Sequence, residues 1–250
     1  MRPIPRPAWM ANYLVTIPAA ISSIRQHPPG VDPTLDSIPQ LNWAMLKDEP
    51  LSCIIQHMQE DGFRNWGFVV YRCAYANDSQ WESYLEFLKE AVREDLEFFE
   101  LETLLWKHLK WTIIEDPEDL DSASKQHRDG PGADDPWLRK RPRFKYCIYV
   151  DQRCFDTVDQ YQAWVEQGAI GIPKTVVCAI LDRTSKPSGR GRDGYPSVEG
   201  CTKMDTGWMY TDVSVLSGVY DRLSVEELSK RDYERPPEVW PMGDPMPFEP

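Results

Sequence analysis

Several signatures of common functional classes are missing from these 250 residues. The six cysteines form no Cys-x-x-Cys pair and no Cys/His cluster at zinc spacing, so neither a disulfide scaffold nor a zinc site is indicated and a reducing, cytoplasmic location is expected. No apolar run is long enough to span a membrane. The sequence also lacks a His-Glu-x-x-His motif and a Gly-x-Ser-x-Gly elbow, which leaves zinc and serine hydrolases without support.

Positive charge is scarce as well. Lys and Arg number 28 against 40 Asp and Glu, a net charge of −12, and this argues against nucleic acid as the main partner because phosphate binding needs a positive field. Residues 82–121 carry thirteen acidic and four basic side chains, whereas residues 125–145 carry seven basic and three acidic ones. The pattern fits two solvated faces of opposite sign, and it also fits an acidic surface that docks a basic partner.

Proline is concentrated at the two ends of the chain. Nine of the 22 prolines lie in residues 1–50 and six in residues 236–250. Because proline lacks a backbone donor and disfavours helix before it, we expect a proline-rich N-terminal arm with a short helix (1–60), a core domain (64–235) and a proline-rich tail (236–250). The apolar, acid-free segment 1–31 loosely resembles a targeting peptide, but its prolines favour an extended arm.

The core begins with the segment Trp66–Tyr75, which is apolar on both faces of an extended strand and is therefore expected in the middle of a sheet. Ser79 and Glu82 have the spacing of a capping box, so a helix is expected to begin at Ser79. Apolar residues then recur at helical spacing, as in a helix packed on a sheet: Trp81, Leu85, Leu88, Val92 and Leu96.

The remaining elements follow from the same periodicities. A helical piece is expected at 99–108, a helix at 154–167, and a last short helix capped by Ser224 and Glu227. Strands are expected at 111–115, 144–151, 175–182 and 208–216, separated by polar loops at 116–142 and 183–206. The order β-α-β-β-α-β with an extra strand and a terminal helix predicts an α+β, ferredoxin-like sandwich.

Three short motifs are weak. Gly189–Gly194 matches G-x-G-x-x-G, but no strand directly precedes it and no helix follows, so a dinucleotide site is not expected. Glu115–Asp121 contains five carboxylates, and hard cations such as magnesium bind at such clusters. Because the spacing lacks the pattern of a calcium loop, a solvated turn with helix-capping acids is favoured over a metal site. The basic run Arg139–Arg143 has the composition of a nuclear import signal, a common false positive. We therefore predict no cofactor and no bound metal.

Four residues are candidates for a functional site. Arg72 stands out because charge is rare in a strand that is covered on both faces, so it is expected to form a buried ion pair or to bind a ligand. Tyr71 is its neighbour, and His108 precedes a predicted strand. Asp151, like Asp78, follows a strand and precedes a helix, where aspartate commonly caps the helix.

Three blocks of this sequence carry a resemblance: Trp66–Tyr75, Leu109–Asp116 and Phe144–Asp151. Together they resemble a large uncharacterised family of fungal intracellular proteins, and the similarity covers about residues 64–235. The resemblance implies a soluble intracellular protein, and it assigns no functional residue.

Two functional hypotheses remain. The first is a binding or interaction protein of unknown ligand or partner, which the two long polar loops and the lack of catalytic motifs favour. The second is a small cofactor-independent enzyme that performs proton transfer or cyclisation on a hydrophobic metabolite. In that case Arg72, Tyr71, His108 and Asp151 would lie around one cavity, with Arg72 stabilising negative charge and an acid or histidine moving the proton. A partner protein or a small molecule is expected in either case, and neither nucleic acid nor membrane.

Overall fold

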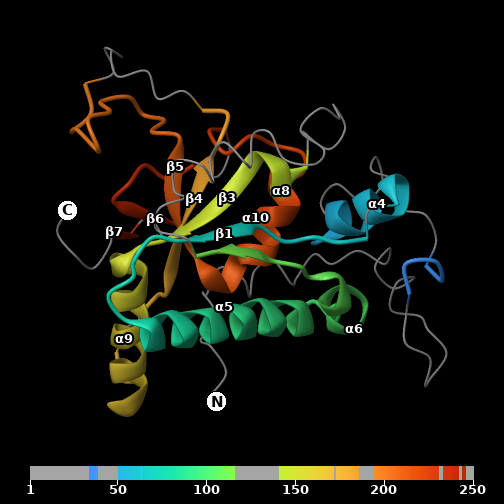
Figure 1. Cartoon of the computed structure of the whole chain (residues 1–250), viewed down its shortest axis with the longest axis horizontal. Helices are drawn as coiled ribbons and strands as arrows, with labels where there is room; N and C mark the ends of the chain where they lie inside the picture. The colour runs from blue at the N-terminus through green and yellow to red at the C-terminus, as the bar shows by residue number, and fades with distance from the viewer. Residues whose placement is uncertain are drawn as a thin grey trace.

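The computed structural model describes residues 34–38, 50–62, 64–115, 141–171, 173–185, 194–230, 233–241 and 244–245. These residues form a mixed seven-stranded sheet with helices packed against it (Figure 1). The strands are β1 (Val69–Arg72), β2 (Thr112–Ile114), β3 (Tyr146–Val150), β4 (Val177–Asp182), β5 (Trp208–Asp212), β6 (Glu238–Trp240) and β7 (Asp244–Pro245). The helices are α4 (Ser52–Asp61), α5 (Asp78–Phe98), α6 (Glu102–Leu105), α8 (Pro142–Lys145), α9 (Gln152–Glu166) and α10 (Leu216–Leu223), with short 3₁₀ helices η2 (Trp106–His108) and η4 (Val213–Val215). The predicted α+β class is confirmed.

The strand order differs from the ferredoxin-like arrangement that the sequence suggested. The order is β2-β1-β3-β4-β5-β6-β7, and β1 runs parallel to both of its neighbours. In a ferredoxin-like sheet the second and third strands are antiparallel neighbours. Here β2 and β3 lie on opposite sides of β1. After β1 the chain passes through helices α5 and α6 and then forms β2, which pairs in parallel with β1 on the side that β3 does not occupy. In a ferredoxin-like sheet the first and third strands are parallel neighbours, and β1 and β3 do pair in this way.

Strand β1 is buried on both faces, as its apolar sequence predicted. Phe68 and Val70 belong to the main core, which the helices share. Val69 and Tyr71 face the other side, where they form a smaller cluster with Cys147 of β3. The two clusters place the main hydrophobic core between the sheet and its helices, and a thinner apolar layer on the opposite face.

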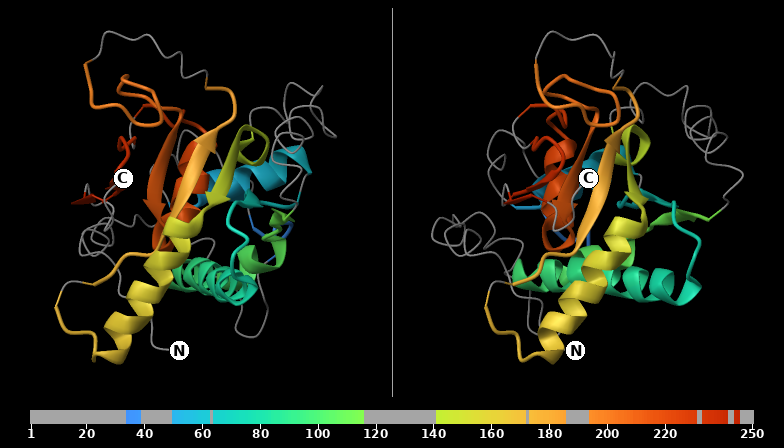
Figure 2. Two further views of the ribbon diagram at one scale, coloured as in Figure 1. Left: turned by 60° about the vertical axis from the view of Figure 1, so that its left-hand side comes forward. Right: turned by 90° about the vertical axis from the view of Figure 1, so that its left-hand side faces the viewer.

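Helix α5 crosses one face of the sheet and covers the main core on that side (Figures 1 and 2). Its N-terminal cap differs from the predicted capping box. The side chain of Asn77 accepts hydrogen bonds from the backbone nitrogens of Ser79 (3.0 Å) and Gln80 (3.4 Å), so the N-cap lies two residues before the predicted one, Ser79. Asn is among the best N-cap residues, and its extended backbone places the amide oxygen over the first turn.

Helix α9 meets α5 close to the start of that helix (Figure 2). Asp151 caps α9 by accepting a hydrogen bond from the Cys154 backbone nitrogen at 3.1 Å, which confirms its predicted capping role. Phe155 packs edge-on against Tyr84 of α5, with ring centroids 5.7 Å apart. The two helices therefore share one layer on the main-core side of the sheet.

The segment after β5 differs most from the prediction. A strand was expected at 208–216, but the chain turns at Asp212, whose side chain accepts a hydrogen bond from the Ser214 backbone nitrogen at 2.8 Å and opens η4. Helix α10 follows directly, and Ser224 is its C-terminal cap rather than the start of a helix. The β-branched residues of this stretch favour strand locally, but tertiary packing against α5 and α4 decides otherwise.

Two domain boundaries can be compared with the structure. The short helix expected in the N-terminal segment is present as α4. The sheet also extends past residue 235, because β6 pairs in parallel with β5 inside the range that was expected to be a tail. Residues 1–33, the acidic run after Glu115, the first two residues of the Arg139–Arg143 run and Gly189–Asp193 lie outside the described residues, so the expectations for them remain predictions.

Candidate functional site

Arg72 is buried near the end of β1 and is held by several neighbours. Its Nε donates to the carbonyl oxygen of Ala74 at 2.9 Å, and its Nη2 contacts a carboxylate oxygen of Asp78 at 2.5 Å. The guanidinium also lies 5.0 Å from the ring centroid of Tyr75 and 5.5 Å from that of Trp81. Of the two roles expected for Arg72, this geometry is that of a structural ion pair.

Tyr71 lies on the opposite face of the sheet from Arg72. It is 1% exposed, and its ring stacks on Tyr149 of β3 with a centroid distance of 5.1 Å. The contact belongs to the thinner apolar layer with Val69 and Cys147. Tyr71 and Arg72 are therefore neighbours in sequence that face different environments.

His108 and Asp151 lie at opposite ends of the parallel strands. The backbone oxygen of His108 accepts a hydrogen bond from the Trp66 nitrogen, which places His108 beside the segment that leads into β1. Its Nδ1 lies 2.8 Å from the Arg64 carbonyl oxygen, and burial lowers the His108 pKa. Asp151 directly follows Val150, which pairs with Arg72 at the far end of β1. The structure thus places Arg72 and Asp151 together at the C-terminal ends of β1 and β3, and it places His108 near the opposite end of β1.

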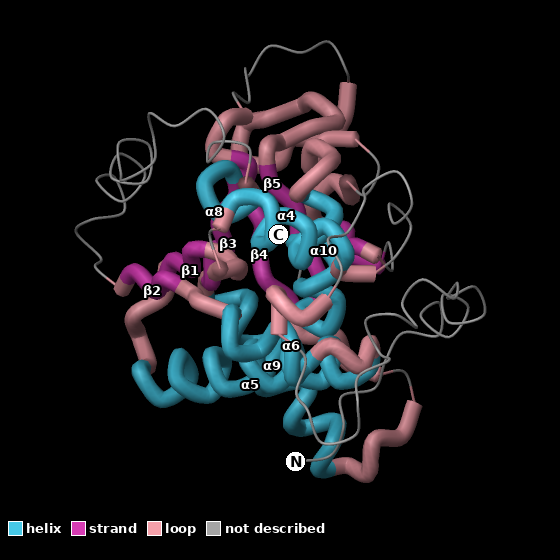
Figure 3. Tube along the Cα trace, turned by 90° about the vertical axis from the view of Figure 1, so that its right-hand side faces the viewer, coloured by secondary structure: helices cyan, strands magenta, loops and turns pink. Residues whose placement is uncertain are grey.

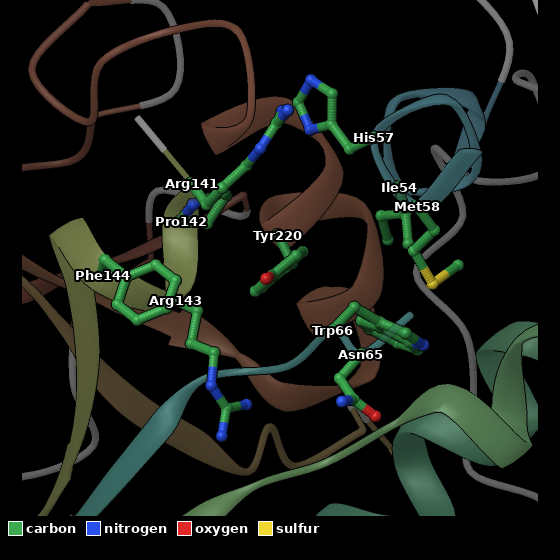
Figure 4. Close-up of a pocket in the computed structure, with 10 residues that line it drawn as sticks. All are labelled: Ile54, His57, Met58, Asn65, Trp66, Arg141, Pro142, Arg143, Phe144 and Tyr220. Atoms are coloured by element: carbon green, nitrogen blue, oxygen red, sulfur yellow. The ribbon is translucent and has the colours of Figure 1, made fainter. Parts of the chain in front are cut away.

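A cleft lined by a different set of residues lies between α4, α8 and α10. Figure 3 shows these three helices next to one another. The space between its walls is about 350 Å³ when the open solvent in front of them is counted, so it is a shallow cleft and not an enclosed cavity. None of the four predicted site residues lines it. The ten described lining residues come from α4, the segment before β1, the α8 turn and α10: Ile54, His57, Met58, Asn65, Trp66, Arg141, Pro142, Arg143, Phe144 and Tyr220 (Figure 4).

Aromatic side chains build one wall of this cleft. Tyr220 packs edge-on against Trp66 and Phe68, with ring centroids 5.6 and 4.9 Å apart. The Trp66 indole nitrogen donates to the Leu105 carbonyl oxygen at 2.9 Å, which fixes the ring. Because each ring is locked by a neighbour, this wall is rigid before any ligand arrives.

Gly67, next to Trp66 of this wall, allows the chain to pass close to the side chains of Trp111 and Leu109. Its φ is +108°, and a Cβ atom there would lie 2.8 Å from the Trp111 side chain and 2.9 Å from that of Leu109. Glycine is therefore required by both backbone conformation and space. Its carbonyl oxygen accepts a hydrogen bond from Nη1 of Arg143 at 3.1 Å.

Two arginines of the α8 turn flank Tyr220. Figure 4 shows Arg141 extending toward His57 on one side and Arg143 extending to the other side with Asn65. Burial raises the pKa of Tyr220 to about 12, and the charges of Arg143 and Arg141 act in the opposite direction. Both arginines are therefore close enough to set the electrostatic potential at the phenol.

Arg143 is also a structural clamp. Besides Gly67, its guanidinium contacts the Lys110 carbonyl oxygen and the Thr112 hydroxyl, the latter at 2.6 Å. These are neutral acceptors, and burial lowers the Arg143 pKa. The clamp joins the starts of β1 and β2 to the α8 turn while it adds positive charge beside the cleft.

Asp221 ties the two helical walls of the cleft together. Its carboxylate accepts a hydrogen bond from the Ile54 backbone nitrogen at 2.9 Å, near the N-terminus of α4. Burial raises the Asp221 pKa to about 7, and the bonds from the first turn of α4 offset part of that cost. The neighbouring residues Ile54 and Tyr220 both line the cleft, so this bond fixes its width.

The residues of this cleft were not predicted as a site. Arg141 and Arg143 belong to the basic run noted in the sequence, and Trp66 opens the first strand motif. Tyr220 and His57 carried no sequence signal, because only the packing of α10 against α4 brings them near the arginines. A signal was available in the excess of basic residues at 125–145 in an otherwise acidic chain.

The described residues contain neither a metal-binding cluster nor a membrane-spanning helix. Among the described residues, no three His, Cys, Asp or Glu side chains are grouped so that they could hold a metal ion. Within the same part of the chain, no helix combines the length and apolar character needed to cross a membrane. Comparisons with protein-family models, curated proteins and solved structures found no match. The resemblance to the fungal family therefore remains a prediction.

Proposed function

We propose that this chain is a small-molecule binding protein whose site is the cleft between α4, α8 and α10. The observation that carries the proposal is the chemistry of the lining. An aromatic and aliphatic wall faces a rim of polar and basic side chains, which is the usual composition of ligand sites in proteins.

The rigidity of the walls supports the same proposal. The Trp66 ring is held by its hydrogen bond to Leu105, and the Tyr220 ring is held by its contacts with Trp66 and Phe68. Helix α4 is held by the hydrogen bond to Asp221. Binding in such a site costs little free energy for the ordering of protein side chains, so a modest contact area can give measurable affinity.

The enzyme hypothesis has less support. It needed Arg72, Tyr71, His108 and Asp151 around one cavity, but Arg72 is paired with Asp78 and His108 lies at the other end of β1. None of the four lines the cleft described above. We therefore favour binding without catalysis.

Native mass spectrometry of the protein purified from its own host tests the proposal. We expect an additional small-molecule mass on the wild-type chain, which disappears on mild denaturation. His57 lines the cleft, so in His57→Trp the larger side chain should occupy part of the space, and the adduct should be lost while the fold is kept.

The matched control is Arg93→Gln, a change on the exposed side of α5, where Arg93 contacts Glu97. It should retain the adduct. Wild-type protein that arrives without any adduct, or an adduct that persists in His57→Trp, would contradict the proposal. Circular dichroism of each variant checks that the fold is unchanged.

A further inference from the structure

A short turn that precedes the sheet in sequence, Thr34–Ile38, packs onto the domain as a separate piece. Figure 1 shows this turn in blue, near α4. Leu35 is 3% exposed and Ile38 is 5% exposed, and both belong to the main hydrophobic core. Residues 1–33 and 39–49, on either side of the turn, lie outside the described residues. The contacts of the turn with the domain therefore decide what it can do.

The turn folds through its own hydrogen bonds. The Ser37 hydroxyl and backbone nitrogen donate to the Thr34 carbonyl oxygen at 2.9 and 3.0 Å. The Thr34 backbone nitrogen donates to the Ser37 hydroxyl at 2.9 Å. Serine and threonine hydroxyls close turns locally in this way. The segment therefore resembles a short peptide that brings its own structure to a binding surface.

Three kinds of contact hold the turn on the domain. Leu35 and Ile38 are its buried apolar anchors, spaced by three residues. The side-chain nitrogen of Gln59, on α4, donates to the Leu35 carbonyl oxygen at 3.3 Å. The guanidinium of Arg64, between α4 and β1, donates to both carboxylate oxygens of Asp36 at 2.6 and 2.8 Å. Two apolar anchors and one acidic side chain held by a bidentate arginine are the kinds of contact by which domains recognise short peptides.

These contacts also allow exchange of the bound segment. The side chains of Arg64 and Asp36 are 49% and 72% exposed, so water and salt compete with their pairing. Residues 39–49 separate the turn from Pro50, and an extended chain of this length spans up to about 40 Å. The turn can therefore leave the surface while it stays attached to the domain.

We infer that the surface beside Gln59 and Arg64 is a peptide-recognition site. Its partner is a segment of another protein with the pattern Leu-Asp-x-Ile, and the chain's own turn occupies the site until that partner displaces it. A second copy of this chain offers only the contacts that the resident turn already makes, and the resident turn is favoured because it is joined to the domain. A partner protein that adds contacts of its own can overcome this advantage.

This site is distinct from the cleft of the proposed function. Neither Gln59 nor Arg64 is among the described residues that line that cleft. The inference therefore goes beyond the proposed function and does not depend on it.

A synthetic peptide with the sequence of residues 33–40 is the probe. It is titrated into ¹⁵N-labelled full-length protein in which Leu35→Ser and Ile38→Ser remove the anchors of the resident turn. The Kd is taken from the shifts of the Gln59 side-chain amide and the Arg64 backbone signal. We expect a Kd on the order of 0.1–1 mM, since two apolar side chains and one exposed ion pair make a small contact. Wild-type protein should bind the peptide about tenfold more weakly, or weaker still, because its own turn occupies the site.

A charge reversal tests the recognition of the acidic residue. At low salt, a peptide with Asp36→Lys should bind the serine variant about threefold more weakly than the unmodified peptide does. Adding Arg64→Asp to the protein should restore the affinity of this lysine peptide, because the charges are again opposite. Arg93→Gln on α5 is the control and should change neither Kd. Equal affinities of the two peptides for the serine variant would overturn the proposed recognition of an acid.

A second variant keeps the inference testable if the serine variant does not fold. Asp36→Lys changes an exposed side chain and weakens only the resident turn, so this protein should bind the unmodified peptide more tightly than wild type does. Equal binding by Asp36→Lys and wild-type protein would overturn the inference. So would a folded serine variant whose Gln59 and Arg64 signals do not move at millimolar peptide.

Discussion

Arg72 and Asp78 form an ion pair in which the arginine side chain is 6% exposed and the aspartate is 84% exposed. The buried partner depends on the exposed one, together with the Ala74 carbonyl oxygen and two aromatic rings, for compensation of its charge. The pair stands where β1 ends and α5 begins, so it fixes the turn between the central strand and the longest helix that the structure describes.

Replacing these two residues should have unequal effects. Arg72→Ala removes packing, hydrogen bonds and ring contacts, and we expect it to lower the free energy of unfolding by about 2–4 kcal/mol. Asp78→Ala removes an exposed partner and should cost about 1 kcal/mol. Urea unfolding followed by tryptophan fluorescence measures both. Equal costs for the two replacements would show that the packing and ring contacts of Arg72 add little to stability, and would contradict this prediction. Loss of the small-molecule adduct in a folded Arg72→Ala protein would assign Arg72 a role in ligand binding.

The cap of α5 gives a second prediction. Because Asn77 accepts both hydrogen bonds from the first turn, Asn77→Ala should lower the free energy of unfolding by about 1 kcal/mol. Ser79→Ala should cost less, since the Ser79 hydroxyl donates only to Asn77. The comparison is made by urea unfolding under identical conditions. A larger cost for Ser79→Ala would favour the capping box that the sequence suggested.

Gly67 is predicted to be intolerant of a side chain. Gly67→Ala combines strain at positive φ with overlap against Trp111 and Leu109, and we expect a loss of about 2–4 kcal/mol. Gly62→Ala is the matched control, because Gly62 also has positive φ but no atom within 4 Å of an added Cβ. It should cost about 1 kcal/mol. Similar losses at the two positions in urea unfolding would show that crowding beside the cleft is unimportant.

The raised pKa of Asp221 leads to a prediction of how the stability of the fold changes with pH. Its pKa is raised from 3.8 to about 7 in the folded protein, so between these values the folded chain binds the proton that the unfolded chain has released. The stability that this group contributes is therefore highest at low pH and falls as pH rises through 7, by on the order of 4 kcal/mol.

Asp221→Asn should remove this component, so that the difference in unfolding free energy between variant and wild type grows in favour of the variant from pH 5 to pH 8 (roughly the range in which the folded group titrates). Urea unfolding at several pH values measures it. A difference that stays constant with pH would show that the carboxyl group of Asp221 titrates at its ordinary pKa.

The sequence predicted those elements whose periodicity is strong. The strand at Trp66–Tyr75 and the helices around Leu88 and Phe155 are present because each buries a continuous apolar stripe. Strand order was not predictable, since a β-α-β pattern does not reveal which edge of β1 the chain returns to. Helix α10 was missed because Val213 and Val215 favour strand, and the Asp212 turn overrides that preference.

The candidate site was less predictable than the fold. Arg72 was recognised as a buried charge that needed a partner, and its pairing with Asp78 follows that expectation. The cleft itself depends on Ile54, Arg141 and Tyr220, which are distant in sequence and meet only through the packing of α4, α8 and α10. No local pattern contains that information.

The most direct test of the account is a crystal structure of the full-length protein purified from its own host. We predict electron density for a co-purified small molecule in the α4–α8–α10 cleft, with its apolar part against Tyr220 and Trp66. Density for the small molecule at another place on the protein, with that cleft empty, would contradict the account.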